Sequence, residues 1–115
     1  MTAQALFRLR IYLDDTIAIG PGKVQLLQAI QEHRSISAAA RALDMSYRRA
    51  WNLVDEMNQS LQSPAVTSAT GGSGGGGASL TATGEAIVAG YRNIEAIANQ
   101  AAMTEIEALK ALLKT

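Results

Sequence analysis

Cysteine is absent from this 115-residue sequence, which also contains a single histidine and a single tryptophan. The lack of cysteine excludes disulfides and thiolate zinc sites, and His33 has no partner at metal-ligand spacing. No apolar run reaches the roughly 18 residues that a membrane-spanning helix needs, and residues 1–10 lack the basic-then-apolar pattern of a secretory signal. We therefore expect a cytoplasmic protein with no bound metal and no membrane partner.

The sequence also lacks the residue sets that enzymes use. No combination of nucleophile, base and orienting group stands out. The acidic pairs at positions 14–15 and 55–56 fit a turn and a helix surface better than a catalytic cleft. Because 48% of the residues are hydrophobic, the chain has enough apolar content for one folded core. We expect a non-enzymatic domain that needs no cofactor.

The ten basic and ten acidic residues cancel, so the formal net charge is zero. Taken alone, this balance argues against nucleic-acid binding, because phosphate contacts need local positive charge. The distribution is uneven, however. Residues 1–52 carry seven Lys or Arg against four acidic residues (7 − 4 = +3), and residues 53–115 carry three against six (3 − 6 = −3). The positive excess coincides with the most informative segment of the chain, residues 35–52.

That segment, SISAAARALDMSYRRAWN, has the pattern of two short helices joined by a tight turn. Ser35 or Ser37 can cap the first helix, whose alanines allow a second helix to approach closely. Ser46 is a suitable N-cap for a second helix over residues 47–61, since its hydroxyl can accept a backbone N–H. This pattern predicts a helix-turn-helix, whose second helix lies in the DNA major groove.

The preceding residues predict a β-hairpin and a helix. Residues 7–13 alternate between apolar and polar side chains, with the period of a half-buried strand. The side chains expected to point inward are Phe7, Leu9, Ile11 and Leu13. Residues 16–19 can form the return strand. A further helix is expected over residues 21–33, because proline is favoured at the first helical position.

The start of the second helix of the helix-turn-helix supplies candidate DNA-binding side chains. Arginine can form two hydrogen bonds to guanine, and asparagine two to adenine, so Arg48, Arg49 and Asn52 are the expected base-reading residues. Hydroxyls, further arginines and bare backbone suit phosphate oxygens. The residues expected to hold the DNA backbone are Ser37, Arg41, Ser46, Tyr47, Gly74 and Gly75. The alternative for the paired arginines is a solvated helix face. Trp51 is expected to pack between helices rather than to stack on bases.

A glycine-rich stretch follows, TGGSGGGGASLT over residues 70–81. It formally contains the G-x-G-x-x-G pattern of a dinucleotide site, but the preceding strand is short and no suitable βαβ unit is present. No lysine follows the glycines, which argues against a phosphate-binding P-loop. A flexible Gly/Ser linker would have the same composition. The apolar residues on both sides favour a hairpin, and we interpret the stretch as a wing whose backbone N–H groups approach DNA phosphates.

The C-terminal residues 84–114 predict one long helix, capped by Thr81 or Thr83. Apolar residues recur along it at spacings of three and four, with a phase shift near its middle. Such a stripe offers more apolar surface than one small domain can cover. We therefore expect the helix to pair with a second copy of the chain in a homodimer.

The segment SISAAARALDMSYRRAWNLVDEMNQ, followed by TSATGGSGGGGASLTATGEAIV, resembles the N-terminal DNA-binding domain of ModE-type molybdate-responsive transcriptional regulators. That domain is a winged helix related to the one in LysR-type regulators. The resemblance is strongest over residues 36–88. It implies a homodimer on a palindromic operator, with the helix from Ser46 in the major groove and the glycine loop as wing. The family senses molybdate through additional C-terminal domains. The chain ends at Thr115, so we expect no small-molecule ligand within it.

Together these patterns predict a mostly α-helical fold with a small amount of β structure. We expect a winged helix-turn-helix with an N-terminal β-hairpin over residues 1–83, and a long C-terminal dimerisation helix over residues 84–115. The expected function is that of a sequence-specific transcriptional regulator that binds double-stranded DNA as a homodimer. Two alternatives stay open: a winged-helix module for protein interaction, and a DNA-binding subunit controlled by a separate sensor protein.

Overall fold

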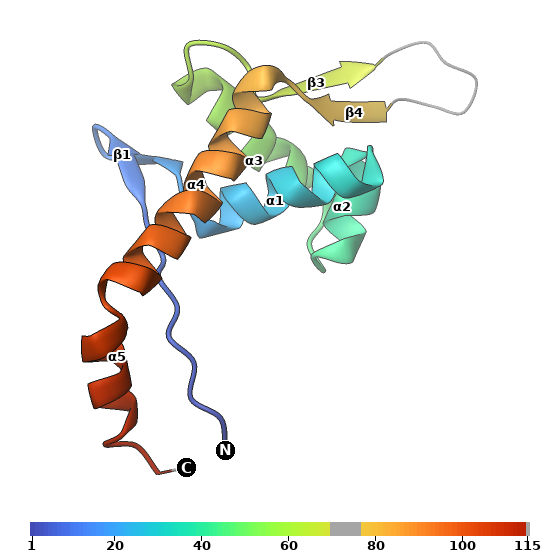
Figure 1. Ribbon diagram of the computed structural model, residues 1–115. Coiled ribbons are helices and arrows are strands. Elements are labelled where there is room, and N and C mark those ends of the chain that lie inside the picture. Colours follow the sequence, from blue (N-terminus) through green and yellow to red (C-terminus); the bar gives the residue numbers. More distant parts are fainter. Residues whose placement is uncertain (70–76, 115) are drawn as a thin grey trace.

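The computed structural model describes residues 1–69 and 77–114. The elements in chain order are β1 (Ile11–Leu13), β2 (Thr16–Ile19), α1 (Pro21–His33), α2 (Ile36–Ala42), α3 (Tyr47–Ser60), β3 (Val66–Ala69), β4 (Gly77–Leu80), α4 (Ala82–Ala101) and α5 (Met103–Lys110). In Figure 1, α1, α2 and α3 form a bundle beside the β3–β4 hairpin, and α4 crosses α1 before leading to α5. This is the predicted winged helix-turn-helix.

The helix boundaries follow local sequence signals. Pro21 stands at the start of α1, where its missing N–H costs no hydrogen bond. Ser35, Ser46 and Thr81 each accept a hydrogen bond from the backbone N–H three residues later, at 3.1 Å, and so begin α2, α3 and α4. Of the predicted alternatives, Ser35 and Thr81 are therefore the caps. The chain reverses between α2 and α3 at Asp44, whose φ is 56°, a conformation that aspartate tolerates better than most residues.

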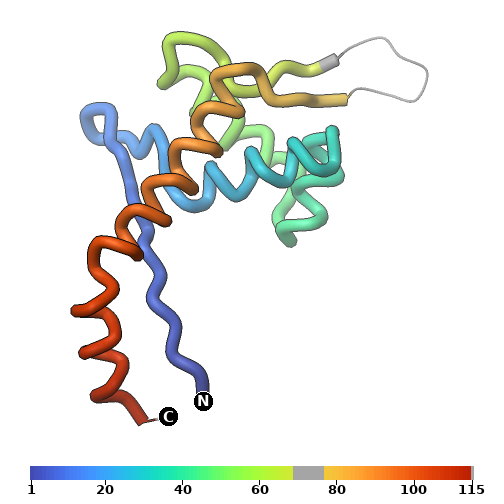
Figure 2. Tube along the Cα trace, viewed as in Figure 1, coloured from blue at the N-terminus to red at the C-terminus, as the bar shows by residue number. Residues whose placement is uncertain are grey.

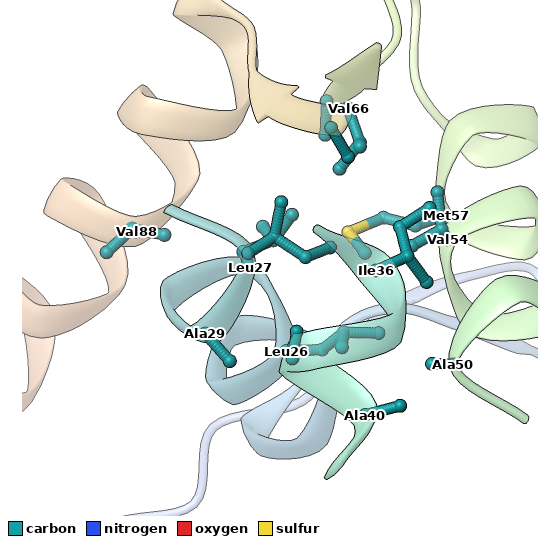
Figure 3. Close-up of a cluster of buried hydrophobic side chains, with 14 residues drawn as sticks. Leu26, Leu27, Ala29, Ile36, Ala40, Ala50, Val54, Met57, Val66 and Val88 are labelled. Carbon is teal, nitrogen blue, oxygen red and sulfur yellow. The ribbon is translucent and has the colours of Figure 1, made fainter. Parts of the chain in front are cut away.

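The hydrophobic core lies where α1, α2 and α3 meet the base of the β3–β4 hairpin. Leu27, Ile30 and Met57 are fully buried there. Figure 3 shows Leu27 and Met57 pointing toward the same space beneath Val66 of β3. Apart from Ile36 at the start of α2, the buried residues of α2 and of the first turn of α3 are small, namely Ala39, Ala40 and Ala50. As predicted, these alanines allow close packing of the two helices of the helix-turn-helix.

Polar contacts anchor the base of the wing, the β3–β4 hairpin. The Asn58 side chain accepts a hydrogen bond from the N–H of Ala65 at 2.8 Å and donates one to the carbonyl of Val66 at 3.3 Å. The N–H of Thr81 donates to the Ala65 carbonyl at 2.9 Å. A Cβ at Gly84 would overlap that same carbonyl group, so only glycine fits there. These contacts determine where the wing leaves the core.

The N-terminal hairpin is shorter than predicted. β1 covers only Ile11–Leu13, and residues 1–10, all of which the structure describes, contain no helix or strand. Phe7, Ile11 and Leu13 are exposed, so the expected inward set was wrong for these residues. An alternating pattern becomes buried only where another layer covers it. Here β1 pairs only at one edge, with β2, and the buried residue of the hairpin is Ala18 of β2.

The predicted single C-terminal helix was also wrong, because the structure has two. α4 ends at Ala101, the backbone leaves the helical region at Ala102 (φ −101°, ψ 12°), and α5 begins at Met103. The break falls where the apolar spacing changes phase, so each helix carries its own stripe. Figure 2 shows α5 and the N-terminal residues at the end of the molecule remote from the wing. The molecule is accordingly elongated, measuring 56 × 32 × 23 Å.

None of these helices, over residues 1–69 and 77–114, is long and apolar enough to cross a membrane.

Candidate nucleic-acid interface

The N-terminal half of α3 presents a surface hollow of about 420 Å³. Its lining residues are Tyr47, Arg48, Trp51 and Asn52, and we call it the α3 hollow. All four side chains are exposed. The opposite side of the helix carries the buried residues Ala50, Val54 and Met57. α3 is thus fixed to the core by one side and displays its first two turns on the other.

The predicted base-reading residues fall on two parts of this helix. Arg48 and Asn52 are four residues apart, so they lie one turn apart on the same face. Arg49 lies about 100° around the helix from Arg48. It lines a second hollow, of about 440 Å³, together with Arg8 and Arg10 of the N-terminal segment. Arg48 and Asn52 therefore line the same hollow, whereas Arg49 lines the second one.

Ser46 and Tyr47 lie at the start of the same helix. The Ser46 Oγ accepts the backbone N–H of Arg49 at 3.1 Å, which leaves its own O–H free to donate to another acceptor. Tyr47 is 55% exposed and forms part of the α3 hollow. Both residues are exposed and stand at the end of α3 whose first backbone N–H groups have no partner within the helix. This end of a helix attracts anions such as phosphate.

Two more of the predicted backbone contacts lie on α2, the first helix of the helix-turn-helix. The Nη1 of Arg41 donates a hydrogen bond to the Oγ of Ser37 at 3.1 Å, on an exposed face. The two residues are one turn apart, so the bond orients the guanidinium group along α2. Arg41 and Ser37 thus act as one unit beside α3.

Trp51 does not pack between helices, and the prediction that it would was wrong. Its side chain is 46% exposed and lines the α3 hollow. The reason is the close approach of α2 and α3. Where the two helices meet, the buried residues are Ala40 and Ala50, and an indole ring would not fit between them. Trp51 also lies off the buried stripe that Ala50, Val54 and Met57 define.

Gly74 and Gly75, the predicted wing contacts, lie outside the described residues. The described stem of the wing is tied to the junction of α1 and α2. The N–H of Ala78 donates to the carbonyl of Arg34 at 3.0 Å, and a Cβ at Gly77 would lie 3.3 Å from that oxygen. The described strands β3 and β4 accordingly lie beside α1 and run toward the side of α2 (Figure 1).

Two supporting contacts were not anticipated from the sequence. Lys23 is buried, and its Nζ pairs with Glu56 Oε1 at 2.7 Å and donates to the carbonyl of Ile17. This joins α1, α3 and β2. The sequence did contain one sign that Lys23 is buried: it stands four residues before Leu27, on the buried stripe of α1. The second contact is the Asn58 clamp on the wing. Its Asn-Gln motif belonged to the family resemblance but had no assigned role.

The single histidine lies at the end of α1, where the Nε2 of His33 is 4.0 Å from a carboxylate oxygen of Glu32. Both side chains are exposed. Over residues 1–69 and 77–114, no three histidine, aspartate or glutamate side chains form a group that could hold a metal ion.

Known proteins share this arrangement. The family described as bacterial regulatory helix-turn-helix protein, lysR family, matches residues 22–85. The chain is 51% identical over 78 residues to the molybdenum-pterin-binding protein MopB of Rhodobacter capsulatus, a match that covers 68% of this chain and 29% of MopB. It is 40% identical over 96 residues to the molybdenum transport protein ModE of Azotobacter vinelandii, covering 83% and 36%.

A further relative is the DNA-binding transcriptional dual regulator ModE of Escherichia coli K12. It is 39% identical over 88 residues, which cover 76% of this chain and 34% of that protein. The chain therefore spans roughly a third of the length of these relatives. Among solved structures, the CbnR_DBD–DNA complex superposes with a TM-score of 0.58 at 22% identity, covering 76% of this chain and 95% of the other. At that identity the likeness shows the fold.

The matched residues 22–85 run from the start of α1 to the start of α4. They include the helix-turn-helix, the wing stem and the glycine that lets α4 approach Ala65. The family consists of regulatory proteins, which confirms the prediction of a protein that is not an enzyme. The chain belongs to the lysR family of bacterial regulatory helix-turn-helix proteins, with ModE-type proteins among its relatives.

Proposed function

We propose that this chain binds double-stranded DNA with sequence specificity, as the DNA-binding part of a ModE-type transcriptional regulator in the cytoplasm. The observation that carries the proposal is the exposed face of α3, where Arg48 and Asn52 lie one turn apart. Arg41 is exposed on α2, the helix that precedes α3, and the described strands of the wing run toward the side of α2 (Figure 1). The E. coli relative is named a DNA-binding transcriptional regulator, which agrees with this use of the fold.

The side chains have distinct roles in this proposal. α3 enters the major groove, where Arg48 binds guanine and Asn52 binds adenine through paired hydrogen bonds. The hydroxyl groups of Ser46 and Tyr47 bind phosphate at the start of α3. Arg49 points to the other flank, toward Arg8 and Arg10, so we assign it to phosphate as well. The remaining residues that we assign to the DNA backbone are Ser37, Arg41, Gly74 and Gly75.

The zero net charge does not oppose this function, because the charges are segregated. The exposed arginines of the first half are Arg8, Arg10, Arg34, Arg41, Arg48 and Arg49. The acidic excess belongs to residues 53–115, which include α4 and α5. Phosphate binding depends on the local potential at the contacting surface, and here that surface is basic.

We further propose that the chain acts as a homodimer through its C-terminal helices. The large exposed apolar residues of α4, α5 and the residues after them are Ile94, Ile97, Met103, Leu109, Leu112 and Leu113. They continue from an apolar groove of about 380 Å³ between α4 and the N-terminal hairpin, which Ile11, Ile87 and Tyr91 help to line. A second copy would cover this surface. A two-fold dimer places its half-sites about 10 base pairs apart or at a multiple of that spacing.

The test begins with selection of a binding site from random duplexes. We expect the selected site to be palindromic and to bind much more tightly than random DNA. Log affinity should fall with log salt concentration at a slope of about −0.9 for each phosphate neutralised. Arg48→Ala should cost about 1–3 kcal/mol on the selected site and relax one base position. Arg49→Ala should weaken binding equally on selected and random DNA.

Lys114→Ala is the control, since it removes one positive charge at the end of the chain remote from α3. Its affinity for the selected site should be unchanged. Equal affinity for selected and random duplexes would refute sequence-specific binding. Binding to neither, at any salt concentration, would favour the alternative of a protein-interaction module.

A further inference from the structure

Two large aromatic side chains lie exposed on the surface that we assign to DNA. Tyr47 is 55% exposed and Trp51 is 46% exposed. They are four residues apart on α3, so their side chains lie next to each other on one flank of the helix. Both line the α3 hollow together with Arg48 and Asn52. Aromatic rings and polar groups thus share one exposed hollow on α3.

Trp51 lies outside the hydrophobic core of the fold. The buried stripe of α3 is complete without it, because Ala50, Val54 and Met57 fill the contact with the core. Within the described parts of the chain, no hydrogen bond engages the indole N–H of Trp51 or the hydroxyl of Tyr47. The indole ring therefore presents both an apolar face and an unused donor to whatever binds α3.

The chemistry of the major groove indicates what the ring contacts. The guanidinium group of Arg48, which lines the same hollow, suits a negatively charged partner, which favours DNA over an apolar protein surface. In the major groove, thymine alone among the four bases presents an apolar group, its C5 methyl, and apolar side chains recognise thymine there. Stacking on bases requires unpaired strands, and insertion between base steps occurs from the minor groove. Neither fits a helix that lies in the major groove of a duplex.

We propose that Trp51, with Tyr47 beside it, recognises thymine through its C5 methyl group and thereby determines part of the sequence specificity. This inference rests on the proposed function of α3 as the recognition helix. Arg48 and Asn52 bind the polar edges of bases, and the aromatic flank selects a thymine next to them. The preferred site therefore contains thymine at one or two positions in each half-site adjacent to the positions that Arg48→Ala relaxes.

The test replaces each thymine of the selected site, one at a time, by deoxyuridine, which lacks only the methyl group. Wild-type protein should lose about fourfold in affinity at the contacted position, the change expected when one buried methyl group is removed. Trp51→Ala should bind the thymine and deoxyuridine sites equally. Trp51→Phe, which keeps an aromatic ring, should retain part of the preference. Tyr12→Ala, which removes an exposed aromatic ring from β1, should behave as wild type.

The outcomes separate this inference from the proposed function. If wild-type protein selects no sequence, the proposed function itself fails. If it selects a site but tolerates deoxyuridine at every position, only the role of Trp51 is overturned. A methyl preference that persists in Trp51→Ala would assign the thymine contact to another residue and would also overturn it. The deoxyuridine series on wild-type protein detects the methyl contact without any variant, and the comparison with Trp51→Ala assigns it to the indole ring. Far-ultraviolet circular dichroism of Trp51→Ala and Trp51→Phe should show the same helicity as wild type.

Discussion

Apolar side chains are buried at one end of this molecule and exposed at the other. In the helix-turn-helix, Leu27, Ile30 and Met57 are fully buried beneath the wing. In α5, described over its whole length, no residue is buried, and Leu112 just beyond it is 80% exposed. Both regions have apolar residues at helical spacing. An apolar stripe therefore shows that a helix has a face to cover, but not whether the same chain or a second molecule covers it.

The largest effect on stability is expected for a substitution in the buried core of the helix-turn-helix. Leu27→Ala should lower the free energy of unfolding by about 2–5 kcal/mol, because it leaves a cavity in the centre of the core. Leu112→Ala, the same substitution at the exposed end, should change it by less than about 0.5 kcal/mol in the monomer. Urea unfolding at low protein concentration measures both. Similar losses for the two variants would show that the C-terminal end is packed in solution.

Two glycines of α4 give a second comparison. Gly84→Ala should destabilise the fold by about 1–3 kcal/mol, since its Cβ would overlap the Ala65 backbone at the base of the wing. Gly90, two turns further along α4, has open space where a Cβ would be placed. Gly90→Ala should therefore stabilise the helix by about 0.5–1 kcal/mol. Thermal unfolding of both variants is the measurement. A stable Gly84→Ala variant would mean that α4 can shift relative to the wing.

The sequence predicted most elements whose signals are local. Proline at the start of α1, the serine caps of α2 and α3, and the 3.6-residue period together gave the helix-turn-helix. The N-terminal strand and the single C-terminal helix were predicted wrongly, because their lengths depend on what covers them. The alternation of apolar and polar residues over 7–13 has the period of a β-strand, but only Ile11–Leu13 pair with β2. The phase shift near Ala102 was visible in the sequence, but only the backbone shows that it is a break.

The candidate site was predictable in part. The cap at Ser46 and the spacing of Arg48 and Asn52 are local, and the structure places these residues on one exposed surface; their DNA contacts stay predictions. Arg49 follows Arg48 in the sequence, yet it lies on a different flank of α3. Trp51 was misplaced because its position depends on how closely α2 approaches α3. The pairing of Lys23 with Glu56, 33 residues apart, depends on tertiary packing that no local pattern specifies.

A charge added to the exposed apolar stripe of α4 should weaken self-association and leave the stability of the fold unchanged. Ile97 is 60% exposed on the apolar stripe of α4. Ile97→Asp should weaken self-association at least tenfold, or about 1.4 kcal/mol, because a dimer would bury the new carboxylate without a partner. Sedimentation velocity across a concentration series measures this. Ala96→Asp is the matched control, because it adds the same charge at an exposed position on the other side of the helix. Equal association of both variants would exclude this face as the dimer contact.

A smaller effect is expected where the N-terminal segment contacts α4. Tyr91 is buried, and its hydroxyl donates a hydrogen bond at 2.9 Å to the carbonyl of Leu9, which holds the N-terminal segment against α4. Tyr91→Phe keeps the ring in the core and removes this bond, at a cost of about 1 kcal/mol.

Because Arg8 and Arg10 flank Leu9, limited trypsin digestion followed by mass spectrometry measures release of the N-terminal segment. Cleavage after these arginines should be several-fold faster in Tyr91→Phe and unchanged in Tyr12→Phe, whose ring is exposed. Unchanged cleavage in both variants would show that apolar contacts of Leu9 in the groove hold the segment without the hydrogen bond, and that the covered part of the molecule extends further toward the N-terminus.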